Sequence, residues 1–171
     1  MDQGMFERIL VGFDGSVHAR RAVQVASEIA GRFRSTLTIA VVRPSALGED
    51  VARLEALVPI SEDGRTLATM LDEMRNRALA QGARLVEPVT LHGEVLDSLL
   101  EYLARNPQDL VVVGSRGLSP GRRLLVGSVS SGLVNSALCP VLVVRPGPPP
   151  PLPGDARAPV RASGPATGVS D

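Results

Sequence analysis

The stretch DLVVVGSRGLSPGRRLLVGS, residues 109–128, contains the strongest indications of fold and function in this chain. Its apolar run at 110–113 is typical of a strand that is buried on both faces. Glycines follow at positions 114, 117, 121 and 127, and a helical pattern of apolar residues begins after Ser128. A strand, a glycine-rich loop and a helix amino terminus allow backbone N–H groups to surround an anion. The stretch therefore predicts a binding site for nucleotide phosphates.

The segments around this stretch alternate between strand and helix patterns. Apolar runs at 6–13, 37–42 and 141–144 predict buried strands, and 84–91, which contains Pro88, predicts an edge strand. Apolar residues spaced three and four apart predict helices after Ser16, over 66–80 and after Val95. This alternation predicts an α/β protein, with one domain over residues 1–146 and a parallel sheet covered by helices on both faces.

Two segments depart from the alternation. Residues 46–63 contain only a short apolar stretch between Pro44 and Pro59, and they are expected to form a long connection. Between Pro146 and Pro165 lie 8 of the 14 prolines. Because residues 147–171 have few large apolar side chains to bury, we predict that they form a disordered, proline-rich tail.

The composition excludes several classes of protein. The net charge is zero and only 2% of residues are aromatic, so nothing indicates a nucleic-acid partner. No apolar run approaches the roughly 18 residues of a membrane helix, and the first residues lack the apolar core of a signal peptide. Cys139 is the only cysteine, and we expect it to be a packing residue in a cytoplasmic protein.

Catalytic groups are scarce in the sequence. All 18 basic residues are arginine, which excludes a Walker A lysine and Schiff-base chemistry. His18 and His92 are too few for a zinc triad and are expected to be incidental surface or loop residues. Neutralisation of phosphates would have to come from Mg²⁺, a helix dipole and arginines such as Arg116. Arg122 and Arg123 are more simply explained as a solvated pair.

The glycine spacing carries a family resemblance. Gly114-x-x-Gly117, nine residues and then Gly127-Ser128 match G-x2-G-x9-G-[S/T], which resembles the nucleotide-binding signature of the ATP-binding branch of the universal stress protein family. ILVGFDGS, DLVVVGSRG and LCPVLVVRP resemble further family blocks in the same order, over about residues 5–146. The resemblance implies a Rossmann-like, five-stranded sheet of order 3-2-1-4-5. It also implies a stress-response regulator that binds ATP, with Mg²⁺, between strands one and four.

The resemblance implies roles for single residues as well. Asp14 would bind the nucleoside end, and Val41 would contact adenine through its backbone. Gly114 and Gly117 would let the backbone approach the ligand, and the helix start after Gly127 would bind phosphates. The full predicted set is Gly12, Asp14, Val41, Val113, Gly114, Gly117, Gly127, Ser128, Val129 and Ser130. The edge strand at 141–146 would pair with its copy in a homodimer.

Two other functions stay open from the residues alone. The first is an ATP-dependent enzyme on the same fold, either a slow ATPase or a nucleotidyl transferase or hydrolase. The second is an interaction module that binds no nucleotide and uses its glycines only for structure. We expect binding without more than weak ATP hydrolysis and predict no catalytic residue, because no lysine, histidine or glutamine is placed in the loop to activate water. ATP, AMP and cyclic AMP are all compatible ligands.

Overall fold

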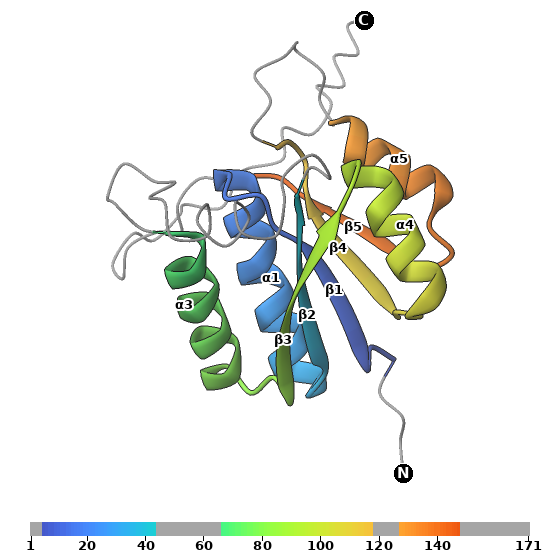
Figure 1. Cartoon of the computed structure of the whole chain (residues 1–171). Helices are drawn as coiled ribbons and strands as arrows, with labels where there is room; N and C mark the ends of the chain where they lie inside the picture. The colour runs from blue at the N-terminus through green and yellow to red at the C-terminus, as the bar shows by residue number, and fades with distance from the viewer. Residues whose placement is uncertain (1–4, 44–65, 118–126, 148–171) are drawn as a thin grey trace, which may run out of the picture.

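The computed structural model describes residues 5–43, 66–117 and 127–147, which form a five-stranded parallel sheet with helices on both faces. The strand order is β3-β2-β1-β4-β5, so the predicted order is confirmed (Figure 1). None of the described helices is long and apolar enough to cross a membrane. The elements are β1 (Arg8–Gly12), α1 (Val17–Phe33), β2 (Thr36–Arg43), α3 (Leu67–Ala80), β3 (Leu85–His92), α4 (Val95–Arg105), β4 (Leu110–Gly114), α5 (Ser128–Ser136) and β5 (Val141–Val144).

Several predictions concern residues outside the described ranges. The long connection at 46–63, Gly121, Arg122 and Arg123 lie there, as does the predicted tail from residue 148 onward. Their predicted properties stay predictions.

Two apolar layers hold the helices on the sheet. Helices α1 and α3 cover one face, and α4 and α5 cover the other (Figure 1). Alternate residues of β1 serve the two layers, because Ile9 and Val11 face α1 and α3 whereas Leu10 faces α4 and α5. All three side chains are fully buried. A strand with both faces covered needs an uninterrupted apolar run, which explains the pattern seen in the sequence.

The carboxylate of Asp109 fixes the start of β1 beside the start of β4. Its Oδ2 atom accepts hydrogen bonds from the N–H groups of Glu7 (2.9 Å) and Arg8 (2.8 Å). The Asp109 N–H in turn donates to the Arg8 carbonyl at 2.9 Å. From this start the strands run parallel, with Ile9 opposite Leu110. The two strands that lead into the glycine-rich turns therefore end at the same edge of the sheet.

Pro88 lies on the outer side of β3, as predicted for an edge strand. The Gly93 N–H donates to the Arg43 carbonyl at 2.8 Å, so the odd-numbered residues of β2 and β3 share the hydrogen bonds between these strands. Since successive residues of a strand direct their peptide groups to opposite sides, Pro88 directs its backbone away from β2. Its missing N–H therefore costs the sheet no hydrogen bond and blunts the edge.

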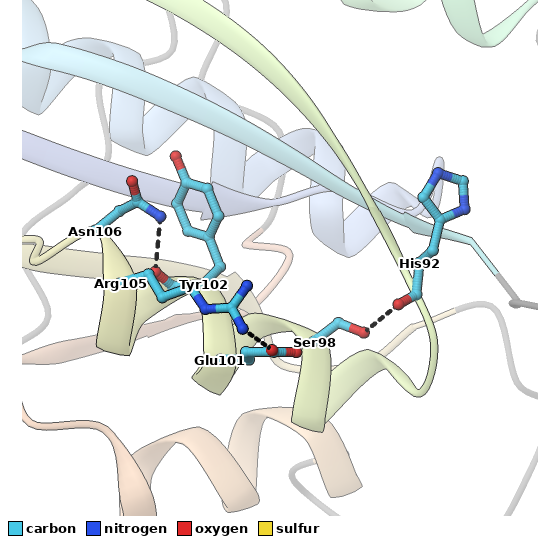
Figure 2. Close-up of polar contacts among 6 residues, drawn as sticks. All are labelled: His92, Ser98, Glu101, Tyr102, Arg105 and Asn106. Carbon is cyan, nitrogen blue, oxygen red and sulfur yellow. Dashed lines mark hydrogen bonds and ion pairs between the residues drawn. The ribbon is translucent and has the colours of Figure 1, made fainter.

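Polar contacts fix α4 at both of its ends (Figure 2). At its start, the Ser98 hydroxyl donates to the His92 carbonyl at 3.2 Å, while the imidazole ring of His92 points away from the helix. At its end, the Asn106 side chain donates to the Tyr102 carbonyl at 3.1 Å. An exposed ion pair between Arg105 and Glu101, four residues apart, adds little stability. The bond from Ser98 joins the end of β3 to the helix that follows it.

Candidate nucleotide-binding site

The carboxyl ends of β1 and β4 lie side by side where the winding of the sheet reverses. Val11 and Val112 are the last residues in register between these strands. One residue further, a Cβ on Gly12 would lie 3.4 Å from Val113 Cγ1, an ordinary contact. Beyond these residues the chain leaves β1 for α1 on one face and leaves β4 for α5 on the other. Open α/β sheets bind ligands at such a point.

A tight turn after β1 brings Asp14 to the loop after β4. Gly15 has a φ of 86°, a conformation that favours glycine, and the Ser16 N–H donates to Asp14 Oδ1 at 2.9 Å. The other carboxylate oxygen faces the glycine loop, because a Cβ on Gly117 would lie 2.7 Å from Asp14 Oδ2. The exposed Asp14 carboxylate and the Gly117 backbone therefore form adjacent parts of one site.

Gly114 is pressed against the first turn of α1. A Cβ at this position would lie 2.8 Å from the His18 carbonyl carbon, 2.9 Å from His18 Cβ and 3.0 Å from the Ala19 nitrogen. Side-chain carbons do not approach backbone atoms this closely. The approach of a ligand is the predicted reason for Gly114, but the space beside its Cα is taken by helix α1. The requirement for glycine here arises from packing.

Ser115 connects three elements at the end of β4. Its N–H donates to the Val144 carbonyl of β5 at 2.8 Å, and its carbonyl accepts from the Gly127 N–H at 2.7 Å. Its hydroxyl lies 3.0 Å from Nδ1 of His18 in α1. The bond to Gly127 brings the two ends of the glycine-rich loop together. Ser115 was not predicted from the sequence, and His18 was predicted to be incidental. The position of His18 in the first turn of a helix that faces β4 could have indicated the contact.

The amino terminus of α5 directs backbone N–H groups out of the helix. The first bond within the helix runs from the Ser131 N–H to the Gly127 carbonyl at 3.0 Å, so the N–H groups of 128–130 precede it. Among the described residues no side chain caps this end, whereas Ser16 Oγ caps α1 by accepting from the Ala19 N–H at 3.0 Å. The buried Ser130 hydroxyl donates to the Gly127 carbonyl at 3.2 Å, whereas Ser128 is exposed. This helix start suits an anion.

Gly127 is not required by the described structure around it. Its φ of −72° and ψ of 164° are accessible to any residue. A Cβ there would make contacts of 3.4 Å or longer, the closest of them with the Ser115 carbonyl oxygen. Within the described residues, neither the backbone nor the packing explains a glycine at this helix start.

Val41 lies in the wall of the site at the end of β2. Its side chain is buried in the layer that contains Phe13 and α1. The Phe13 N–H donates to the Ala40 carbonyl at 2.8 Å, so even-numbered residues of β2 direct their peptide groups toward β1. The peptide groups of Val41 consequently face β3, and the peptide groups of Val42 point past the end of β1. The backbone contact of Val41 with adenine stays a prediction.

Cys139 lies outside this crevice, between α5 and β5. It is half-buried and packs in the layer formed by α4, α5 and the sheet. Burial, followed by the nearby Asp109 carboxylate, raises the pKa of the Cys139 thiol above its ordinary value. A thiol with a raised pKa forms little thiolate near neutral pH, which agrees with a packing role.

The profile of the Universal stress protein family matches residues 5–145. The chain belongs to the universal stress protein family. A universal stress protein of Thermus aquaticus is 32% identical over 146 residues, which cover 82% of this chain and 100% of that protein. The structure of the universal stress protein UspA from Lactobacillus plantarum superposes with a TM-score of 0.64 at 28% identity, covering 82% of this chain and 98% of that one.

A universal stress protein solved in complex with cyclic AMP is also similar. Its TM-score is 0.66 at 30% identity, and the match covers 82% of this chain and 97% of that chain. The family, the strand order and the two-layer arrangement of helices thus agree with the resemblance noted in the sequence.

Proposed function

We propose that this universal stress protein binds an adenine nucleotide at the carboxyl ends of β1 and β4 and regulates a stress response through its bound state. One observation carries the proposal. The loop after β4 touches Asp14 at Gly117 and holds the start of α5 through the hydrogen bond from Gly127 to Ser115. A carboxylate for the nucleoside and a helix amino terminus for the phosphates thereby meet at one loop.

The phosphate end of the nucleotide is assigned to the start of α5. The N–H groups of Ser128, Val129 and Ser130, together with the Ser128 hydroxyl, are the proposed donors. A phosphate in front of the helix also supplies a reason for Gly127, because a side chain there would occupy the space that the anion needs. The backbone of Gly114 and Gly117 forms the adjoining side of the phosphate site.

The nucleoside end is assigned to the turn after β1. The Asp14 carboxylate, which is directed at Gly117, is a suitable acceptor for ribose hydroxyl groups. Gly12, Val41 and Val113 lie at the ends of three adjacent strands and form the wall beside it. Adenine is favoured over other bases because the relative of 30% identity was solved with cyclic AMP.

A magnesium ion fits this site only as a companion of the phosphates. Within the described residues no cluster of three or more histidine, cysteine or carboxylate side chains could hold a metal ion. Mg²⁺ commonly retains several waters and binds one or two carboxylates together with substrate phosphates. Asp14 can contribute one such carboxylate, and a bound Mg²⁺ would neutralise phosphate charge in a chain that has no lysine.

We assign binding rather than turnover to the site. One oxygen of Asp14 already accepts the Ser16 N–H, and among the described residues no group of three or more histidine, cysteine or carboxylate side chains could hold a catalytic metal ion. Calorimetric titration with ATP, AMP and cyclic AMP tests the binding proposal, with GTP as the control for base recognition. Dissociation constants above millimolar for all three adenine nucleotides would refute it. Turnover of ATP with Mg²⁺ near about 1 s⁻¹ would instead identify an enzyme.

We further propose that the protein is located in the cytoplasm. We also propose that two copies of it pair along β5. This strand is at the edge of the sheet (Figure 1). The carbonyls of Pro140 and Val144 accept bonds from β4, so the even-numbered residues face β4 and the peptide groups of Val141 and Val143 face outward. An apolar edge strand with outward N–H and C=O groups suits pairing with its own copy about a two-fold axis.

A further inference from the structure

His18 contacts the glycine-rich loop from a helix that is distant in sequence. Its Nδ1 lies 3.0 Å from Ser115 Oγ, across a sequence separation of 97 residues. The contact is close because Gly114 has no side chain, so the first turn of α1 rests directly on the end of β4. Ser115 is 2% exposed, which shields this hydrogen bond from competition with water.

Ser115 is hydrogen-bonded through its N–H, its carbonyl and its hydroxyl. Its N–H is bonded to β5, its carbonyl holds the Gly127 N–H and its hydroxyl meets His18. Loss of the contact with His18 would let Ser115 shift, and its carbonyl, which holds the start of α5, would shift with it. His18 thus influences the place from which the N–H groups of 128–130 are directed at an anion.

The same helix turn also carries the opposite end of the site. Ser16 caps α1 through its hydroxyl and donates its N–H to Asp14. His18 follows two residues later on this turn. The hydrogen bond between His18 and Ser115 is consequently a direct connection between the turn that orients Asp14 and the loop that positions α5.

We propose that His18 is a positioning residue that, through Ser115, sets the spacing between Asp14 and the amino terminus of α5. This inference rests on the proposed nucleotide-binding function. A nucleotide must reach from the carboxylate to the helix start, so its affinity depends on that spacing. Adenosine has no phosphate and does not reach the helix start, so its affinity does not depend on that spacing. The link therefore contributes to selectivity for a phosphorylated ligand over its nucleoside.

The test is a double-mutant cycle on the affinity for whichever of ATP, AMP and cyclic AMP binds the wild-type protein most tightly. His18→Ala and Ser115→Ala should each weaken that affinity about 3- to 10-fold, the range expected for one lost hydrogen bond. The double variant should be no weaker than either single variant. His18→Asn should restore affinity to within about twofold, because its side-chain amide lies near the place of Nδ1.

Further readouts separate positioning from general stability. Where adenosine binding is measurable, His18→Ala should leave it within about twofold of wild type. His92→Ala is the matched control, since this exposed histidine at the end of β3 should have no effect. Thermal melts check that each variant folds. If His18→Ala does not fold, the affinity of His18→Asn still tests the proposal.

The failures of the two proposals are distinguishable. If the wild-type protein binds none of the three nucleotides, the proposed function and this inference fall together. If it binds one of them and His18→Ala binds it equally well, only the role of His18 is refuted. Multiplying effects in the double variant would also refute it, because they would show that His18 and Ser115 act independently.

Discussion

Alanine at Gly114 should mainly lower stability, whereas alanine at Gly127 should mainly weaken nucleotide binding. At Gly114 the added methyl group would lie 2.8 Å from a backbone carbon of His18 and 3.0 Å from the Ala19 nitrogen. Neither atom can move without the helix, so α1 must shift away from the sheet. Overpacking of this kind costs about 1–3 kcal/mol. At about 2–4 °C per kcal/mol, a cost of about 2 kcal/mol lowers the melting temperature by about 4–8 °C.

At Gly127 the same methyl group meets no atom of the described residues closer than 3.4 Å and requires no change of φ. Replacing glycine by alanine at a helix N-cap should therefore cost less than about 1 kcal/mol. The methyl group would, however, intrude where a phosphate approaches the N–H groups. Losing one charge-assisted hydrogen bond of about 1.5–3 kcal/mol weakens nucleotide binding about 10- to 150-fold.

Thermal denaturation and calorimetric titration of the two variants check both expectations. If Gly114→Ala melts within about 1 °C of the wild-type protein, the close packing of α1 against β4 is refuted. The assignment of the phosphate site is refuted if Gly127→Ala retains full affinity. Equal destabilisation by both substitutions would contradict the difference in packing between the two glycines.

Three further predictions address the turn after β1, the sheet edge and the thiol. Asp14→Asn should preserve the bond from the Ser16 N–H, yet weaken nucleotide binding several-fold, because removal of the charged acceptor costs about 1 kcal/mol. Stronger binding in titrations would show that the carboxylate opposes the phosphates. Val143→Pro removes an outward N–H without breaking a bond to β4, so it should yield monomers in sedimentation while Val143→Ala stays dimeric; a dimeric proline variant would place the interface elsewhere. Because its pKa is raised, Cys139 should react with iodoacetamide at pH 8 more slowly in the folded than in the urea-unfolded protein. Equal rates would contradict the burial of this thiol.

The arrangement of strands and helices was largely predictable from the sequence. Continuous apolar runs identified strands with both faces covered, and β5 begins and ends where the pattern predicted. Ser16 was predictable as a cap because its hydroxyl needs only the backbone of the next turn. Pro88 indicated an edge because a missing N–H is tolerated only on an unpaired side. These features depend on residues close together in the chain.

The surroundings of each glycine in the site were decided by the tertiary structure. The spacing of Gly114, Gly117 and Gly127 suggested one common role beside a ligand. In the folded chain Gly114 is required by α1, Gly117 faces Asp14 and Gly127 faces no close neighbour among the described residues. A sequence pattern shows where side chains are missing. What occupies the space depends on how a helix rests on the sheet.

By itself, therefore, the sequence determined the class of fold, the family and the segment that holds the candidate anion site, because periodicity and glycine spacing are local properties. The contact of His18 with Ser115, the direction of the peptide groups of Val41 and Val42, and the outward face of β5 were decided only by tertiary structure. Each depends on distances between segments far apart in the chain, or on which residues of a strand direct their peptide groups toward a given neighbouring strand. The packing of α1 and the register of the sheet set both.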